Sequence, residues 1–293
     1  MNKTAWIFPG QGSQAIGMET NLREHPLAQE RFNQAEAILN WSVLELCQGD
    51  EEKLAQTLYT QPCLYVIESI LAELLLKEEN PPALVAGHSL GEYVALFTAG
   101  VFDFPTGLNL VKKRAQLMDS SAGGKMVAMM QFNREELEAK VAATADVVIA
   151  NDNSPQQVVI SGTPTAVDEV VKQVKAKRAV PLKVSGAFHS PLMQEAATEF
   201  AQVLAEVEFN DAKIPVIANV DPTPATAAAE IKTRLIQQMT GSVRWREISE
   251  YLSQQGITEV VEIGPGKVLT GLIKRTCPDL ELKNIAKIDE FSV

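Results

Sequence analysis

The stretch ALVAGHSLGEYVALFTAG, residues 83–100, contains the most informative pattern in this sequence. Residues 83–86 are apolar and predict a buried strand, whereas residues 92–99 predict a helix. The turn between them is GHSLG, a GxSxG pattern with Ser89 at its centre. On so sharp a strand-to-helix turn, the serine hydroxyl projects above the sheet, where a nucleophile needs to lie. Ser89 is therefore a candidate nucleophile, and the alternative is a serine that merely caps the helix.

Strands and helices alternate on both sides of this turn. Before it, residues 4–8 (TAWIF) predict a buried strand that ends in a glycine turn, and residues 62–77 predict an amphipathic helix. After residue 190, the pattern predicts a helix over 192–207, a strand over 215–219, a further helix, a strand over 259–266 and a helix from 267. This alternation indicates an α/β fold with a mostly parallel sheet.

Residues 126–185 have a different rhythm. The predicted elements are a strand over 126–131, a helix over 134–143, strands over 146–151 and 156–162 around the turn-rich DNSP, a helix over 165–177 and a strand over 180–186. The order βαββαβ is typical of a ferredoxin-like unit. We therefore expect residues 125–189 to form a small subdomain inserted into a large α/β catalytic domain, which comprises residues 1–124 and 190–293.

Composition and charge exclude several classes of protein. The 293 residues are 46% hydrophobic and 22% charged, as in ordinary folded proteins, and the net charge of −11 disfavours a nucleic-acid partner. The three cysteines, at positions 47, 63 and 277, have no CxxC spacing, which argues against a disulfide framework and a zinc site. No stretch approaches the roughly 18 apolar residues of a membrane span. We expect a cytoplasmic protein with no metal and no membrane association, and a monomer because no coiled-coil heptads are visible.

A serine nucleophile needs a base, and the chain has only three histidines. His25 lies in a polar segment, and His88 adjoins the serine on a turn, where a neighbouring side chain generally points elsewhere. His189, in GAFHSPLM, lies where the chain re-enters the large domain, so it is the candidate base. The alternative is a histidine whose hydrogen bonds are satisfied within an interdomain loop.

Arg114 lies in the middle of the apolar face of a predicted helix. A guanidinium buried there needs an anionic partner. Two interpretations remain open at this point. The partner is either an Asp or Glu in a structural ion pair, or the carboxylate of a substrate held by a bidentate clamp.

Two further patterns are weaker. Residues 10–15 (GQGSQA) match the permissive dinucleotide form GxGxxA, with Glu30 where a ribose-binding acid is expected; the other role of such a loop is to offer a backbone N–H at an oxyanion site. Basic residues between 172 and 183 have no acid among them, so they form either a docking surface for an acidic partner or phosphate, or simply a solvated helix face.

Six motifs, in order along the chain, resemble those of the malonyl-CoA:acyl carrier protein transacylases of bacterial-type fatty acid synthesis. They are FPGQGSQ at 8–14, GHSLGEY at 87–93, the arginine in KKRAQLM, NDNSPQQVVISG at 151–162, GAFHSPLM at 186–193 and EIGPGKVL at 262–269. The resemblance spans essentially the whole chain. It implies a large domain related to α/β hydrolases, a ferredoxin-like subdomain, malonyl-CoA as substrate rather than cofactor, and acyl carrier protein as partner.

The resemblance also implies roles for individual residues. Ser89 would be the nucleophile and His189 the base, with the backbone N–H groups of Gln11 and Leu90 forming the oxyanion hole. Arg114 would pair with the malonyl carboxylate, and the backbone carbonyl of Gln238, in LIQQMTGSVRW, would orient the histidine. Phe188, directly before the histidine, indicates malonyl rather than methylmalonyl units. Asn151 and Asn153 match an NxN element of the family to which we assign no catalytic role.

Two other functions account for less of the sequence. A serine esterase or thioesterase would use the same turn with water as acceptor, but hydrolase triads usually place the histidine late in the chain after a dedicated acid, and nothing in that class requires Arg114. A dinucleotide-binding or non-enzymatic role would rest on residues 10–15 alone, and it would leave Ser89 and His189 unexplained.

Overall fold

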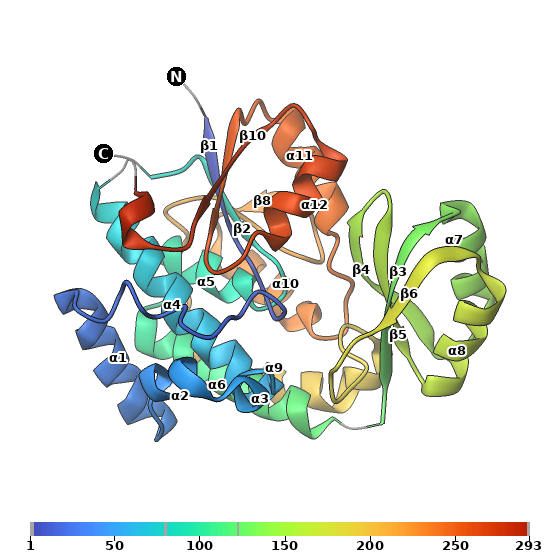
Figure 1. Ribbon diagram of the computed structural model, residues 1–293, viewed down its shortest axis with the longest axis horizontal. Coiled ribbons are helices and arrows are strands. Elements are labelled where there is room, and N and C mark those ends of the chain that lie inside the picture. The colour runs from blue at the N-terminus through green and yellow to red at the C-terminus, as the bar shows by residue number, and fades with distance from the viewer. Residues whose placement is uncertain (1–2, 79–80, 122, 292–293) are drawn as a thin grey trace.

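The computed structural model describes residues 3–78, 81–121 and 123–291, and these residues contain two sheets (Figure 1). The larger sheet has the strand order β10-β9-β1-β2-β7-β8. Strand β1 pairs in parallel with β2 and β9, β9 with β10 and β2 with β7, whereas the short β8 is antiparallel to β7. The strands are β1 (Thr4–Phe8), β2 (Leu84–Gly87), β7 (Val216–Ile217), β8 (Pro224–Ala225), β9 (Glu259–Ile263) and β10 (Glu281–Ile285). The predicted, mostly parallel sheet is confirmed.

Helices cover both faces of this sheet. Trp6 and Phe8 of β1 join one apolar cluster with helices α4, α5 and α6, whereas Ala5 and Ile7 join a second cluster with α11 and α12. A strand buried on both faces is expected to be apolar, as residues 5–8 (AWIF) are. The helices are α1 (Pro26–Leu39), α2 (Val43–Gly49), α3 (Glu51–Leu54), α4 (Thr57–Glu78), α5 (Gly91–Thr98), α6 (Phe104–Ser120), α9 (Gln194–Glu206), α10 (Ala228–Gln238), α11 (Trp245–Gln254) and α12 (Val268–Thr276), with 3-10 turns at Pro191–Met193 and Ile288–Glu290.

Helix α4 is present, but it begins at Thr57, before the predicted start at residue 62, and it is not amphipathic. Residues 60–72 are buried on every side of the helix. The reason is that α1, α5 and α6 all pack against it, which makes α4 a core helix rather than a surface one. Among the residues that the structure describes, no helix is long and apolar enough to cross a membrane.

The second sheet lies beside the first and has its own core. Its strand order is β4-β5-β3-β6, with antiparallel pairs throughout, and its apolar side chains include Val127, Ile160 and Val167. The elements are β3 (Lys125–Phe132), α7 (Arg134–Ala143), β4 (Val147–Ser154), β5 (Gln157–Gly162), α8 (Pro164–Gln173) and β6 (Ala176–Pro181). The element order βαββαβ is as predicted.

Several boundaries in this unit differ from the prediction, and the strand predicted over 180–186 spans 176–181. Helix α8 ends at Gln173 and not at 177, because Val174 is extended and β6 pairs with β3 from Ala176 onward. Lys177 and Arg178 therefore lie on an edge strand, so the solvated helix face, one of the two alternatives for this basic stretch, is wrong for these two residues. Strand β4 continues to Ser154, through residues that were predicted to form a turn.

Strand β4 is hydrogen-bonded to Val243, in the segment that precedes α11. The N–H of Asp152 donates to the carbonyl of Val243 at 2.9 Å, and the N–H of Val243 donates to the carbonyl of Ala150 at 2.8 Å. The Asp152 carboxylate also accepts from Arg246 Nε at 2.9 Å and from Arg134 Nη2 at 2.9 Å. These bonds explain why the polar residues of β4 stay extended, and they connect the second sheet to the large one.

Candidate active site

The turn between β2 and α5 holds Ser89 in left-handed geometry, with φ +53°. The two glycines of the turn are required, because a Cβ on Gly87 would lie 1.9 Å from the carbonyl carbon of Gly91, and one on Gly91 would lie 2.0 Å from the carbonyl oxygen of Phe8. The side chain of Asn219 braces this strained turn: its Oδ1 accepts from the Ser89 N–H at 2.7 Å, and its Nδ2 donates to the Gly87 carbonyl at 2.5 Å.

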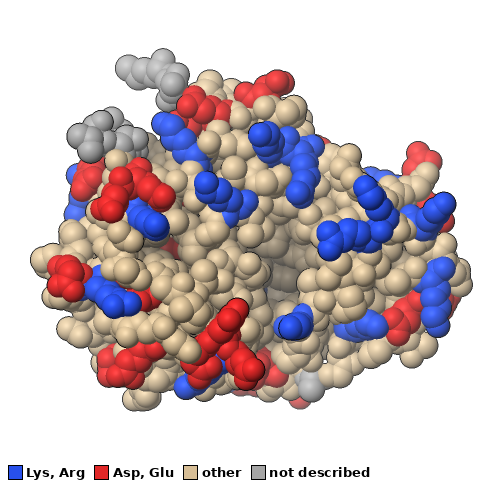
Figure 2. Space-filling view, in the orientation of Figure 1, with Lys and Arg blue, Asp and Glu red and all other residues tan. Residues whose placement is uncertain are grey.

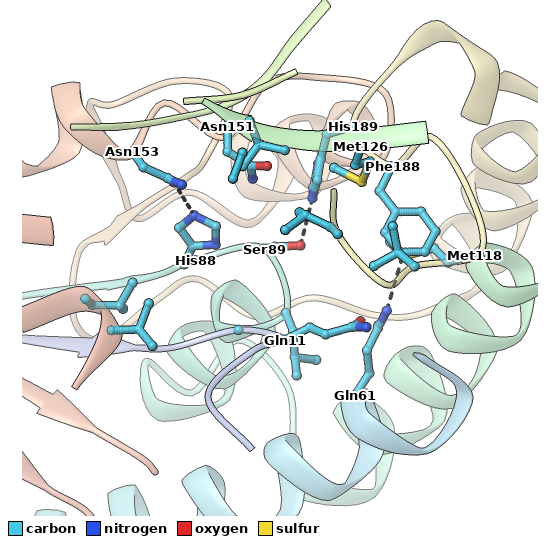
Figure 3. Close-up of a pocket in the computed structure, with 18 of the residues that line it drawn as sticks. Gln11, Gln61, His88, Ser89, Met118, Met126, Asn151, Asn153, Phe188 and His189 are labelled. Atoms are coloured by element: carbon cyan, nitrogen blue, oxygen red, sulfur yellow. Dashed lines mark hydrogen bonds between the residues drawn. The ribbon is translucent and has the colours of Figure 1, made fainter. Parts of the chain in front are cut away.

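His189 lies against the serine, 100 residues away in sequence (Figure 3). Its Nε2 is 2.8 Å from Ser89 Oγ, and its Nδ1 is 2.9 Å from the backbone carbonyl of Gln238 and 3.2 Å from that of Gly241. Because carbonyls only accept, Nδ1 carries the hydrogen and Nε2 is free to take a proton. Burial and the nearby Arg114 lower the pKa of His189 to about 3, so the imidazole is neutral.

Arg114, on α6, is fully buried and contacts the nucleophile directly. Its Nη2 donates to Ser89 Oγ at 2.9 Å and to Gln238 Oε1 at 3.1 Å, while Nη1 donates to Gln61 Oε1 at 2.7 Å. The guanidinium also lies 5.3 Å from the ring centre of Tyr93. Within the described residues, Nε has no partner and no carboxylate forms an ion pair with this arginine. The structural ion pair, left open by the sequence, is therefore not what the structure shows.

A cavity of about 220 Å³ opens onto these groups. Its lining includes Gln11 and Leu90, the two residues expected to offer oxyanion N–H groups, and the apolar side chains of Met126 and Phe188. Figure 3 shows Ser89 and His189 pointing toward one another across this space. In the described parts of the chain, no three His, Cys, Asp or Glu side chains cluster as a metal site would require.

His88 points away from the serine hydroxyl. Its Nε2 lies 2.8 Å from Asn153 Oδ1, and its ring lies against Trp245. Burial lowers the pKa of His88. Asn151, also on β4, lines the same cavity. The neighbouring histidine is thus occupied elsewhere, and only His189 is placed to act on Ser89.

Sequence reasoning missed several buried residues of this site, among them Gln61, Glu92 and Asn219. Glu92 Oε2 accepts from the Asn219 N–H at 3.0 Å and from Gln238 Nε2 at 2.9 Å. Burial raises the pKa of the Glu92 carboxyl to about 7, although both hydrogen bonds oppose this. One signal was available: Glu92 follows Ser89 by three residues on an otherwise apolar helix. Asn219 follows the end of β7, and its partner could not be predicted without the fold.

The dinucleotide interpretation is overturned. A dinucleotide loop opens directly into a helix, but here the helix after β1 begins only at Pro26. Glu30 lies on that helix, with its side chain 61% exposed and paired with Arg31. The GPGK turn, in contrast, joins β9 to α12 as a plain strand-to-helix turn, with Gly264 and Gly266 at positive φ.

Basic side chains stand on both sides of the hollow seen in Figure 2. A second cavity, of about 430 Å³, is lined by Lys177 and Arg178 of β6 and by Arg275 of α12. It shares Gln157 with the first cavity, so the two adjoin. This surface has a local positive charge in a chain whose net charge is −11.

Comparison with known proteins gives a consistent result. The acyl transferase domain family matches residues 5–289. The malonyl CoA-acyl carrier protein transacylase of Synechocystis sp. is 58% identical over 99% of both chains, and that of Bacillus subtilis is 42% identical over 100% of this chain and 96% of the other. The crystal structure of the Synechocystis enzyme superposes with a TM-score of 0.97 over 99% of both chains. A malonyl-transacylase in complex with its type II polyketide acyl-carrier protein is 38% identical, with a TM-score of 0.94 over 99% of this chain and 97% of that one.

Proposed function

This chain belongs to the acyl transferase domain family, and we propose that it transfers the malonyl group from malonyl-CoA to the phosphopantetheine thiol of acyl carrier protein in fatty acid synthesis. The observation that carries the proposal is the buried charge of Arg114, whose hydrogen-bond partners are all neutral and whose Nη2 lies 2.9 Å from the hydroxyl that contacts His189. A carboxylate on the acyl group would supply the missing anion.

The first half-reaction forms an ester on Ser89. Its Oγ attacks the thioester carbonyl while His189 Nε2 takes the hydroxyl proton, and the carbonyl π electrons move to the oxygen. The backbone N–H groups of Gln11 and Leu90 would hold that oxyanion. When the carbonyl re-forms, the carbon–sulfur bond breaks, and His189 returns the proton to the departing CoA thiolate.

In the second half-reaction, His189 again acts first as base and then as acid, and Ser89 becomes the leaving group. His189 Nε2 takes the proton of the phosphopantetheine thiol, and the sulfur attacks the ester carbonyl. Collapse of the second tetrahedral intermediate breaks the bond to Ser89 Oγ, which regains its proton from His189. Because atoms and electrons balance without a further reagent, the mechanism calls for no cofactor and no metal.

Arg114 would make the reaction selective. A malonyl carboxylate can accept from the guanidinium, whereas an acetyl group would leave that buried charge unpaired. Phe188, which is 5% exposed, adds an apolar wall that limits the space beside the acyl carbon.

The finer architecture is also part of this proposal. The antiparallel order β4-β5-β3-β6 supports a ferredoxin-like subdomain at 125–189. The parallel sheet, with helices on both faces and the serine turn at the end of β2, supports a hydrolase-related domain at 1–124 and 190–293. The outer ends of that domain, 1–2 and 292–293, lie outside the described residues. We propose a monomer that acts in the cytoplasm. The basic cavity at Lys177, Arg178 and Arg275 supports docking of an acidic carrier protein.

The test is the intact mass of the protein after incubation with malonyl-CoA or acetyl-CoA, without carrier protein. We expect a malonyl adduct on the wild type, little acetyl adduct, and none of either on Ser89→Ala. Continuous release of CoA with no adduct would instead identify a hydrolase. The absence of both adduct and CoA release would refute covalent catalysis by Ser89.

A further inference from the structure

Glu92 is a buried carboxylate that the mechanism above does not use. It lies in the first turn of α5, is 2% exposed and follows the nucleophile by three residues. A carboxylate in such a place needs hydrogen bonds to offset its lost hydration. Both of the hydrogen bonds that it accepts come from residues that contact the catalytic groups, Asn219 and Gln238.

Gln238 is oriented by these bonds. Its Nε2 donates to Glu92 Oε2 at 2.9 Å and to the Ser89 carbonyl at 2.9 Å, so both amide hydrogens are used. The amide oxygen therefore faces the other way, toward Arg114 Nη2 at 3.1 Å. A flipped amide would bring NH₂ against the guanidinium, and two donors would then face each other.

The same residue touches the base from its main chain. The carbonyl of Gln238 accepts from His189 Nδ1, while its side chain accepts from Arg114. Glu92 itself contacts neither of these groups through a hydrogen bond. Besides its direct electrostatic attraction to Arg114, Glu92 therefore acts on the guanidinium through the Gln238 side chain. Its other hydrogen bond, from Asn219, leads to the serine turn, which both substrates use, so a loss by that route would leave the malonyl-to-acetyl ratio unchanged.

From this geometry we propose that Glu92 is a positioning residue for substrate selection: by fixing the Gln238 amide, it aims Arg114 at the malonyl carboxylate. The inference rests on the proposed function. It predicts that loss of the Glu92 acceptor impairs malonyl transfer much more than acetyl transfer, because only the malonyl group uses Arg114.

The experiment compares kcat/KM for malonyl-CoA and acetyl-CoA, with holo-acyl carrier protein as acceptor, in three single variants and one double variant. Glu92→Leu removes the acceptor, and we expect the malonyl-to-acetyl ratio to fall roughly tenfold or more, as for loss of a hydrogen bond that serves a charged group. Glu92→Gln is the matched control: two donors face this position, so its amide oxygen turns toward them, and the ratio should stay within about threefold of the wild type.

The third variant, Gln238→Met, keeps the backbone carbonyl for His189 but removes the side-chain amide. Its ratio should fall as far as that of Glu92→Leu, and the double variant should fall no further, because both changes break one chain of contacts. Thermal unfolding of each variant shows whether it is folded. If Glu92→Leu does not fold, Gln238→Met and Glu92→Gln still decide the matter.

Three results would overturn the inference: equal losses on both substrates in Glu92→Leu, an unchanged ratio in Gln238→Met, or a ratio in Glu92→Gln as low as in Glu92→Leu. Each of these leaves the proposed function intact, since wild-type malonyl transfer is measured alongside. A wild type that forms no malonyl adduct would instead refute the proposed function, and the inference would fall with it.

Discussion

At the scale of single residues, Arg114 carries the selectivity of the site. Replacing it by Ala removes the cation that a malonyl carboxylate would meet, so malonyl transfer should fall about 100-fold or more, as expected for a charged hydrogen-bonded contact, while acetyl transfer falls far less. Lys113→Ala is the control, because this neighbour on α6 is half-buried, contacts no group of the site and pairs with Glu199. Steady-state kinetics with both substrates would check this, and an equal loss on both would contradict the clamp.

His189 is predicted to remain neutral at physiological pH. Burial and Arg114 lower its pKa to about 3, below the ordinary value near 6.5, so the charged form is disfavoured in the folded protein. The chain has only three histidines, so an NMR titration can follow each imidazole. The His189 resonance, assigned through His189→Gln, should not shift between pH 5 and pH 8. A midpoint near 6.5 would contradict this prediction, because it would show that burial and Arg114 do not disfavour the charged imidazole.

The same lowered pKa affects stability. Unfolded His189 takes up a proton below about pH 6.5, whereas the folded protein does not until about pH 3. The folded state therefore loses stability as the pH falls from about 6.5 toward 3. His189→Gln should weaken this acid sensitivity, which denaturant unfolding at pH 7 and pH 5 would detect.

At the scale of an element, α4 contains a buried carboxyl group that lowers the stability of the folded protein. Glu68 is fully buried, neither carboxyl oxygen has a partner among the described residues, and burial with Glu262 nearby raises its pKa well above the ordinary value. A raised carboxyl pKa means that the folded state resists losing this proton. Stability is therefore retained below about pH 4.5 and declines as the pH rises through the range between the unfolded and folded pKa values.

Glu68→Met should thus stabilise the protein by about 1–3 kcal/mol, more at pH 8 than at pH 5, because an apolar side chain of similar length needs no partner. Thermal unfolding at both pH values measures this. Glu78→Met, at the exposed end of the same helix, should change little. A lower Tm for Glu68→Met at pH 8 would indicate that the carboxyl group has a stabilising partner.

Elements were predictable from sequence where a local pattern decides them. The strand before Ser89 and the helix after it follow from apolar runs and two glycines, and both are present as β2 and α5. The start of β6 was not predictable, because residues 176–181 become a strand only by pairing with β3. The burial of α4 on all sides likewise depends on three helices elsewhere in the chain.

The site divides in the same way. Ser89 was a candidate because of its GxSxG turn, His189 because the chain has few histidines, and Arg114 because it lies on an apolar helix face. In the structure, both His189 and Arg114 lie within hydrogen-bond distance of the Ser89 hydroxyl. Glu92 and Asn219 meet only when the ends of β2 and β7 lie side by side. A contact between residues so far apart in the sequence cannot be predicted from a local pattern.

At the scale of the whole molecule, the second cavity is lined by basic side chains although the net charge of the chain is −11. Arg178→Glu should lower kcat/KM for carrier protein roughly tenfold at low ionic strength, because the acidic partner would lose attraction, and about 0.5 M salt should shrink the difference. Lys77→Glu, at the end of α4, makes the same charge change away from the second cavity and should have little effect. A loss that is equal for both variants, or insensitive to salt, would argue against this docking surface.

The bonds between β4 and Val243 also bear on recombination between homologues. They join residues 150–152 to a segment that begins only two residues after Gly241, whose carbonyl, like that of Gln238, faces His189. A chimera that exchanges residues 125–189 alone would therefore replace one side of this junction and keep the other. Exchanging residues 238–246 together with the insert transfers both sides, so the paired exchange should keep the imidazole aligned where the single exchange does not.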